Sequence, residues 1–311
     1  MFLTRKMLSE TRMFPMKQKN MRNFAAMEHT YDTLYRSLCS LLGSRFGRSE
    51  AQAQAFALLE DMYGASRTDV LMGRSIAFDA AGEQAWASVL EALDRGEAMQ
   101  YVAGRARFCN RYFRVTPAVL IPRPETEQLV EMAVEAQPKR AIDCGTGSGC
   151  IAVSIALALP GSEVWACDIS EAALEIARDN ARRHGARVNF LLRSMLDVAA
   201  WGEAERFDLI VSNPPYICES EAEDMEAVVL DCEPHLALFV PDADALRFYK
   251  ALSKLGRRLL RHGGWLMAEC NTRYAADVAA LWSAEGFADA AVLNDCFGLP
   301  RMVKAQWLGK V

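Results

Sequence analysis

Apolar residues recur at helical spacing through the first third of the chain and fall into three stripes. The second and third stripes each stop at a glycine, Gly64 or Gly96, which is a common end signal of helices. The stripes are Tyr31, Leu34, Tyr35, Leu38, Leu41, Leu42 and Phe46; Ala55, Leu58, Leu59 and Met62; and Trp86, Val89, Leu90 and Leu93. Because they contain no convergent polar cluster, the pattern predicts a helical bundle over residues 31–103 with a packing or docking role.

Short alternating segments follow the bundle and predict a β-hairpin in a linker at 104–122. Apolar and polar positions alternate on both sides of Asn110. Two prolines one residue apart, Pro122 and Pro124, then stiffen the chain before the next helical run. Residues 121–127 are therefore expected to form a rigid hinge between two domains.

The rest of the chain alternates between strand and helix patterns. The strand candidates are 141–143, 163–167, 188–192, 207–211, 265–269, 290–293 and 302–307. The helical runs that separate most of them are 149–158, 171–183, 243–260 and 272–285. Seven strands with interleaved helices predict an α/β fold over residues 123–311, with a seven-stranded, mostly parallel and doubly wound sheet.

Composition narrows the class of protein. The chain has 311 residues, 51% of them hydrophobic, and a net charge of −5. A negative net charge differs from the strongly basic charge that is typical of a dedicated nucleic-acid-binding protein. The longest apolar run, 150–159, is too short for the roughly 20 residues that span a bilayer. Nine cysteines without a CxxC pair favour free thiols in a reducing compartment over a metal site or a disulfide framework, so we expect a cytoplasmic protein.

The first 30 residues differ from all that follows. They are rich in methionine and basic residues, lack hydrophobic periodicity, and are expected to form a disordered basic tail. Three explanations remain open: a start placed upstream of a true one at Met21 or Met27, a mitochondrial transit peptide, or a solvated tail. The second would place the protein in the mitochondrial matrix. The apolar core of a secretory signal is missing, which argues against export.

A glycine-rich turn joins the first strand of the α/β region to its helix. The sequence Asp143-Cys144-Gly145-Thr146-Gly147-Ser148-Gly149 lets the backbone approach a ligand closely at the start of a helix. A dinucleotide site would need its last glycine one residue later, and Asp143 would repel a pyrophosphate. The carboxylate instead suits a cationic ligand such as S-adenosylmethionine. Asp168 ends the next strand, where it can accept both hydroxyls of a ribose. The alternative is a tight turn with no ligand.

A second polar turn, Asn213-Pro214-Pro215-Tyr216, closes the apolar run that ends at Val211. Two consecutive prolines fix the backbone and remove two donors, so the turn offers carbonyls that suit a substrate NH2 group. Ligands of open α/β sheets bind at this carboxyl edge. The alternative is a turn that merely ends a strand.

These motifs together resemble those of class I methyltransferases that act on planar NH2 groups. Over residues 31–311 the chain most closely resembles the N5-glutamine methyltransferases of peptide chain release factors. The segments that carry the resemblance are Gly104-Arg105, Phe113 to Pro117, Leu120 to Glu127, the glycine turn, Asn213-Pro214-Pro215-Tyr216, Glu233-Pro234, Ala237-Leu238, and Asp295 through Gly298 to Arg301.

The resemblance implies a Rossmann-like methyltransferase sheet, S-adenosylmethionine as methyl donor, S-adenosylhomocysteine as product, and no metal. The substrate would be the glutamine of the Gly-Gly-Gln motif in class 1 release factors, with neither membrane nor nucleic acid as a partner. The donor would be bound by Asp143, Gly145, Thr146, Gly147, Ser148, Gly149, Asp168, Leu196 and Asn213. The substrate amide would be held by Asn213, Pro214, Pro215 and Tyr216, of which Asn213, Pro214 and Tyr216 are the expected catalytic residues.

The implied roles at the substrate amide are specific. The Asn213 side-chain carbonyl and the Pro214 backbone carbonyl would accept the two amide N–H bonds and aim the nitrogen at the methyl group. Tyr216 would pack on the amide plane. The chain departs from the family after residues 188–192, where Ser194-Met195-Leu196 stands in place of the usual Ser-Asp before an aromatic that covers the adenine. It departs again where Asn271 replaces a usual glycine.

Two other functions stay open at this point. An N6-adenine-type nucleic-acid methyltransferase presents the same planar NH2 group to the same motif, but it needs a cationic or aromatic route for the flipped base. A non-catalytic module would keep the donor-binding fold only for docking to a translation factor. Binding of the methyl donor without transfer would favour that second alternative.

Overall fold

The computed structural model describes residues 29–202 and 206–309, so most of the expected basic tail lies outside the described residues. The chain divides into two compact units, Met1–Arg95 and Gly96–Val311. The division falls earlier than the boundary expected after residue 103. Helix α5 (Met99–Ala103) belongs to the second unit, where it packs on strand β1 (Arg105–Phe108).

The first unit consists of helices, as the apolar stripes predict. They are α1 (Tyr31–Leu42), α2 (Arg48–Tyr63), α3 (Arg67–Leu71) and α4 (Ala80–Arg95). Leu34, Leu38 and Leu59 from the first two stripes are fully buried, which confirms the predicted faces. Gly64 ends α2 in the left-handed conformation, with φ of 69°. Helix α3 was not predicted because five residues are too few to show a period.

The expected hairpin is present in the second unit. Strand β1 pairs antiparallel with β2 (Arg111–Arg114). Cys109 and Asn110 form the turn with φ of 47° and 57°, the left-handed values that a two-residue turn needs to follow the strand twist. Phe108 and Phe113 are fully buried, so the hairpin is part of the packed second unit rather than a free linker.

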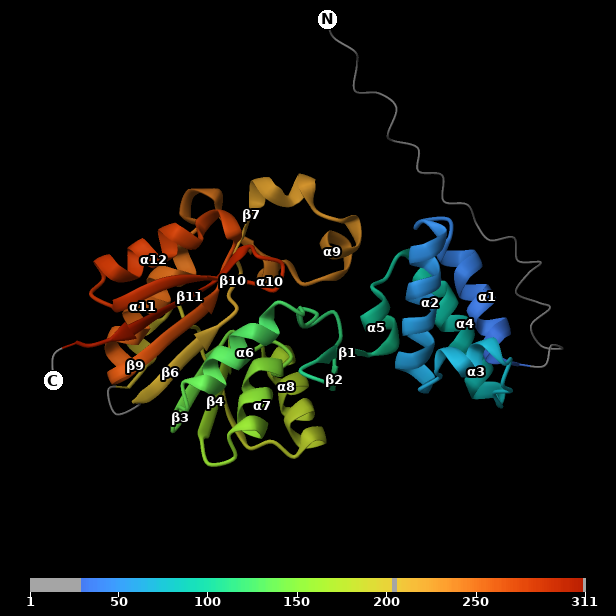
Figure 1. The fold of residues 1–311 in the computed structure, drawn as a ribbon, viewed down its shortest axis with the longest axis horizontal. Coiled ribbons are helices and arrows are strands. Elements are labelled where there is room, and N and C mark those ends of the chain that lie inside the picture. Colours follow the sequence, from blue (N-terminus) through green and yellow to red (C-terminus); the bar gives the residue numbers. More distant parts are fainter. Residues whose placement is uncertain (1–28, 203–205, 310–311) are drawn as a thin grey trace, which may run out of the picture. The chain divides into compact units, whose positions relative to one another are not determined.

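A seven-stranded sheet forms the centre of the second unit, in the order β10-β11-β9-β6-β3-β4-β5 (Figure 1). Strand β11 runs antiparallel to both neighbours and the other pairings are parallel, which confirms the predicted architecture. The strands are β3 (Arg140–Cys144), β4 (Glu163–Asp168), β5 (Val188–Leu192), β6 (Phe207–Ser212), β9 (Leu260–Glu269), β10 (Ala288–Asn294) and β11 (Pro300–Trp307).

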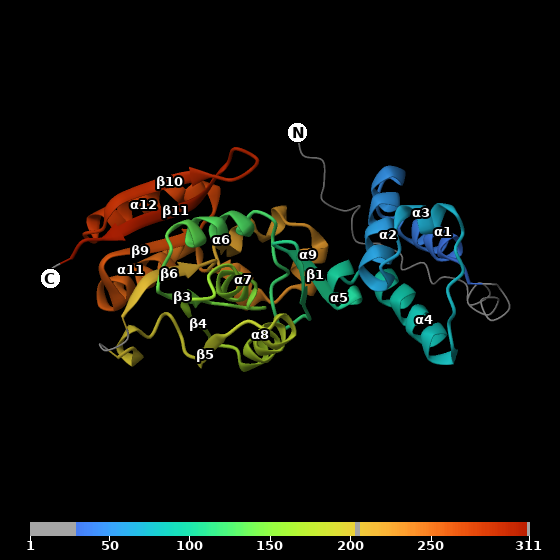
Figure 2. The same cartoon turned by 60° about the horizontal axis from the view of Figure 1, so that its bottom comes forward.

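Helices cover both faces of this sheet (Figure 2). They are α6 (Thr126–Glu135), α7 (Cys150–Ala158) and α8 (Glu171–His184) on one face, and α11 (Arg247–Leu259) and α12 (Ala275–Ala284) on the other. Alternate strand residues enter the two cores: Leu209 and Val211 pack with α6 and α7, while Ile210 packs with α11 and α12. No helix in the described ranges is long and apolar enough to cross a membrane.

A series of short elements between β6 and α11 was not predicted. They are β7 (Ile217–Cys218), α9 (Ala227–Cys232), α10 (His235–Leu238) and β8 (Phe239–Val240), together with two 3-10 turns. Strands β7 and β8 pair with each other in parallel. Two-residue strands show no alternation, so the hydrophobic pattern could not reveal them.

One buried amide joins the hairpin, the glycine turn and helix α8. Asn180 is fully buried; its Oδ1 accepts from the Arg114 backbone N–H at 2.7 Å. Its Nδ2 donates to the backbone carbonyls of Arg114 at 2.9 Å and Ser148 at 2.8 Å. Three strong polar contacts from one side chain therefore fix the turn next to two other elements.

We expect Asn180→Ala to lower the free energy of unfolding by about 2–4 kcal/mol, because each buried polar group left unsatisfied costs about 1–3 kcal/mol. Urea titration followed by circular dichroism measures the change. Asn189→Ala is the control, since Asn189 is exposed on β5 and this change should stay within about 0.5 kcal/mol. Equal losses in the two variants would contradict the role assigned to Asn180.

Candidate active site

The glycine turn between β3 and α7 has a conformation that requires its glycines. Gly145, Gly147 and Gly149 have φ of 75°, 53° and 80°, which residues with a Cβ rarely adopt. A Cβ on Gly149 would also stand 2.9 Å from the Cβ of Ala177 on α8. The turn therefore lies against α8 with its backbone exposed toward the carboxyl edge of the sheet.

Asp143 lies beneath this turn. Its side chain is buried; Oδ2 accepts from the Thr146 hydroxyl at 2.6 Å and from the Ala152 N–H at 3.3 Å. The other oxygen, Oδ1, is buried without a hydrogen-bond partner among the described residues. Burial raises the pKa of Asp143 to about 7. The carboxyl group thus holds the turn in place and keeps one acceptor uncommitted.

Asp168 stands at the end of β4, beside the turn. Its Oδ2 accepts from the Gly147 N–H at 2.9 Å, and its Oδ1 accepts from the Ser170 N–H at 3.0 Å. Each carboxylate oxygen can accept a second hydrogen bond, so both remain able to bind a ligand hydroxyl. The sequence prediction placed Asp168 here.

A hollow of about 590 Å³ opens at this edge of the sheet, within the usual size of a small-molecule site. Predicted site residues that line it are Gly145, Thr146, Gly147, Ser148, Asp168, Leu196, Asn213 and Pro215. Within the described part of the chain, four other predicted residues do not line it: Asp143, Gly149, Pro214 and Tyr216. The structure therefore brings residues of both motifs to one hollow, but these four are not among the residues that line it.

The polar turn after β6 is held by three hydrogen bonds. The Ser212 hydroxyl donates to the Cys144 carbonyl at 2.6 Å, which joins the ends of β6 and β3. The Nδ2 of Asn213 donates to the Thr126 hydroxyl at 3.1 Å. The Tyr216 hydroxyl donates to Oε1 of Glu269 at 3.0 Å. Tyr216 thus faces a buried carboxylate, whereas the sequence prediction had it pack on a substrate.

The segment expected to be an interdomain hinge instead forms part of the hollow. Pro122, Arg123 and Thr126 line it. Arg123 is paired with the buried Glu233 at 2.7 Å, and the same carboxylate accepts from the Ile121 N–H at 3.2 Å. This ion pair fastens the segment to the short elements that follow β6.

Sequence reasoning missed Thr126, Glu233 and Glu269 as site residues. Glu269 ends β9 in the same way as Asp168 ends β4, so the rule that selected Asp168 could have selected it. Thr126 and Glu233 lie in segments that carry the family resemblance, but neither received a role, because each acts through a partner that is distant in the sequence.

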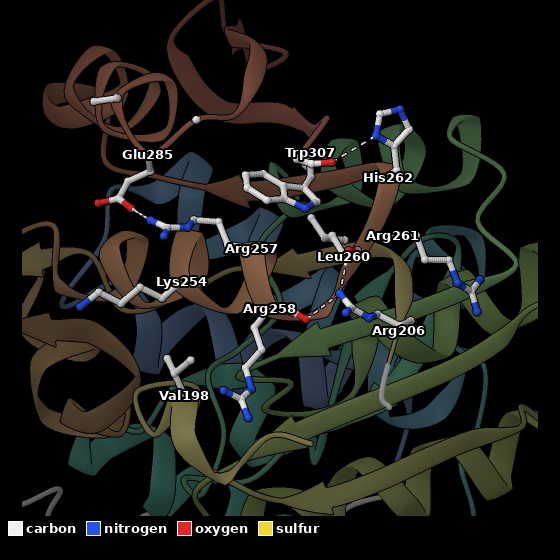
Figure 3. Close-up of a pocket in the computed structure, with 13 residues that line it drawn as sticks. Val198, Arg206, Lys254, Arg257, Arg258, Leu260, Arg261, His262, Glu285 and Trp307 are labelled. Atoms are coloured by element: carbon white, nitrogen blue, oxygen red, sulfur yellow. Dashed lines mark hydrogen bonds and ion pairs between the residues drawn. The ribbon is translucent and has the colours of Figure 1, made fainter. Parts of the chain in front are cut away.

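A larger hollow of about 1250 Å³ lies elsewhere, at the amino ends of β6 and β9 (Figure 3). Cationic side chains dominate its lining, among them Arg206, Arg257 and Arg258. Figure 3 shows Arg257 turned toward Glu285, with which it forms an ion pair. None of the predicted site residues lines this hollow, so the candidate chemistry belongs to the smaller one.

The chain is similar to known methyltransferases. Residues 124–236 match the family described as "Methyltransferase small domain", which spans the glycine turn and the Asn-Pro-Pro-Tyr motif. A methyltransferase structure from Pyrococcus furiosus is 16% identical, with a TM-score of 0.46, and covers 64% of this chain and 89% of that one. The second unit therefore contains a methyltransferase domain.

Curated relatives define the family more narrowly. The release factor glutamine methyltransferase of Bacteroides thetaiotaomicron is 44% identical over 258 residues, which are 82% of this chain and 92% of that protein. The protein of the same name from Flavobacterium psychrophilum is 34% identical, over 86% of this chain and 95% of its own. The chain belongs to the release factor glutamine methyltransferases, which confirms the resemblance seen in the sequence.

The raised pKa of Asp143 predicts a pH-dependent stability. The folded chain keeps this carboxyl protonated up to about pH 7, whereas an unfolded carboxyl loses its proton near pH 3.9. The contribution of protonated Asp143 is therefore present below about pH 4 and is lost as the pH rises to about 7. Asp143→Asn mimics the protonated form, so its stability relative to the wild type should rise over that interval and level off above it.

Urea unfolding of both proteins without methyl donor, at several pH values between 4.5 and 7.5, measures this difference. Asp277→Asn removes an exposed carboxyl and serves as the control. A constant difference between wild type and Asp143→Asn across the interval would show that Asp143 is ionised throughout.

Proposed function

We propose that this chain transfers the methyl group of S-adenosylmethionine to the side-chain amide nitrogen of the glutamine in the Gly-Gly-Gln motif of class 1 release factors. S-adenosylhomocysteine would be the product, and the chemistry we propose assigns no step to a metal. The observation that carries the proposal is the position of Asn213 in the same hollow as Asp168 and the glycine turn. The printed names of the curated relatives support the choice of substrate.

The residues around the glycine turn fit this donor. Asp168 keeps acceptor capacity for two ribose hydroxyls, and Asp143 holds the Thr146 hydroxyl beneath the turn. Two apolar side chains that face the hollow, Ile169 and Leu196, are 51% and 40% exposed and would be covered by a flat base. When bound, the donor supplies a methyl group activated by the sulfonium.

The polar turn would orient the acceptor. An amide nitrogen is a poor nucleophile because its lone pair is delocalised, so the site must hold it in line rather than deprotonate it beforehand. In our proposal Oδ1 of Asn213 and the carbonyl of Pro214 accept its two N–H bonds and stabilise the positive charge that develops on it, until one of these protons is released to solvent. The two prolines keep these acceptors in a fixed geometry.

The test is methyl transfer from a labelled donor to an unmethylated release factor. Its variant with Ala in place of the Gly-Gly-Gln glutamine, bulk DNA and bulk RNA are incubated in parallel. We expect label in the release factor alone. Label in the glutamine variant would show that another residue of the release factor is modified. Label in nucleic acid would favour the N6-adenine-type nucleic-acid methyltransferase instead.

Asn213→Ala removes one preorganised acceptor, and such a loss costs about 100- to 1,000-fold in the chemical step. We expect this reduction in the single-turnover rate with release factor, while the Kd of the methyl donor measured by calorimetry changes little. Asn189→Ala is the matched control and should keep the wild-type rate. A wild-type rate in Asn213→Ala would show that the turn has a structural role only.

We further propose that the helical unit helps to dock the release factor, as expected for residues 31–103. Two apolar side chains at the end of α3, Leu71 and Met72, are 76% and 78% exposed. Exposed neighbouring apolar residues of this size are suited to a protein partner. The docking role separates recognition of the release factor from the chemistry at Asn213.

Replacing Leu71 and Met72 together with Ser should raise KM for the release factor several-fold and leave kcat and donor binding unchanged, because these residues lie outside the catalytic unit. Initial-rate kinetics with the intact release factor measures the split. Leu308→Ser, an exposed leucine of the other unit, is the control. An unchanged KM would show that Leu71 and Met72 at the end of α3 do not contribute to docking.

A further inference from the structure

Glu269 is a buried carboxylate at the end of β9 with both oxygens engaged. Glu269 is 1% exposed. Oε2 accepts from the Thr126 hydroxyl at 2.6 Å, and Oε1 accepts from the Tyr216 hydroxyl at 3.0 Å. Two O–H donors therefore fix the orientation of a group that has no contact with solvent.

Thr126 passes this orientation on to Asn213. The Thr126 hydroxyl has a single proton, and it donates this proton in the hydrogen bond to Oε2 of Glu269 at 2.6 Å. Toward Asn213, Oγ1 of Thr126 can then act only as an acceptor. The Asn213 amide meets this requirement by presenting Nδ2, at 3.1 Å. Oδ1 of Asn213 is therefore the end of the amide that does not bond to Thr126.

The sheet explains why these groups meet. Strands β6 and β9 pair in parallel, with Ser212 opposite Ala268. Asn213 and Glu269 are the next residues after this pair, so they leave the same edge of the sheet side by side. Thr126 is the first residue of α6 and stands between them, although it lies 87 positions from Asn213 in the sequence.

We propose that Glu269 and Thr126 are positioning residues that set which end of the Asn213 amide faces the substrate. The proposal rests on the proposed function. With Nδ2 held by Thr126, Oδ1 can accept an N–H bond from the glutamine amide. With the amide reversed, an NH2 group would face the substrate NH2 group, and two donors cannot bond to each other.

Tyr216 acts in the same network, although it is not among the residues that line the hollow. By occupying Oε1, its hydroxyl leaves Oε2 of Glu269 for Thr126. Burial raises the pKa of Tyr216, so the hydroxyl keeps the proton that it donates. Burial also raises the pKa of Glu269, and this effect is opposed by the hydrogen bonds from Thr126 and Tyr216 and by the charge of Arg301.

Thr126→Val tests the proposal with little change of shape, because it exchanges the hydroxyl for a methyl group. We expect the single-turnover methylation rate to fall about 10- to 100-fold, as misplacement of a reacting group does, with the donor Kd within about twofold of wild type. Thr126→Ser restores the hydroxyl and should recover the rate to within about threefold. Failure of Ser to rescue would overturn the proposal.

A double-mutant cycle separates positioning from a general structural effect. If Thr126 acts through Asn213, Thr126→Val should lower the residual rate of Asn213→Ala by less than about twofold, since coupled residues are not additive. Equal fold-losses in the two backgrounds would overturn the proposal. Glu269→Gln should lower the rate in the same non-additive way, because its NH2 group can donate to Thr126 and release the threonine proton toward Asn213.

A readout without activity keeps this test distinct from that of the proposed function. The side-chain amide resonance of Asn213, identified by its absence in Asn213→Ala, should exchange slowly with solvent in wild type and in Thr126→Ser. It should exchange faster in Thr126→Val. If wild type transfers no methyl group to release factor, the proposed function fails; if the exchange rates are equal in all three proteins, the positioning network fails.

Discussion

The parallel pairing of β6 with β3 on one side and β9 on the other is the constraint on which the site depends. Ile142 and Asp143 pair with Ile210 and Val211, and Ser212 pairs with Ala268. Because parallel strands end at one edge, this register delivers the glycine turn, the polar turn and Glu269 to the same place. A slip of one residue in β6 would turn Asn213 away from the hollow and move the apolar side chains of each core into the other core.

Two buried carboxylates support the two halves of the site. Asp143 accepts from the Thr146 hydroxyl beneath the glycine turn, and Glu269 accepts from the Thr126 hydroxyl beneath the polar turn. In both cases a threonine connects a strand-end acid to the backbone or amide that faces the hollow. Removing either acid would therefore loosen a turn, and it would not remove a direct contact with a ligand.

The sequence predicted the parts of the site that carry a local pattern. Three alternating glycines, Asp168 at a strand end and the proline-stiffened turn at Asn213 could all be found without a structure, as could the seven strands. Thr126 could not be assigned, because its partners are 87 and 143 positions away and only the sheet register brings them together. The elements between β6 and α11 stayed hidden because strands of two residues have no period.

The proline that follows Asn213 has a consequence for the chemical lifetime of the protein. Asparagine side chains age by attack of the next backbone nitrogen on the amide, which closes a five-membered imide and converts the residue to an acid. Pro214 has no N–H to lose, so its nitrogen cannot make that attack. The amide on which the proposed reaction depends is therefore protected from this route of deamidation by the same residue that stiffens the turn.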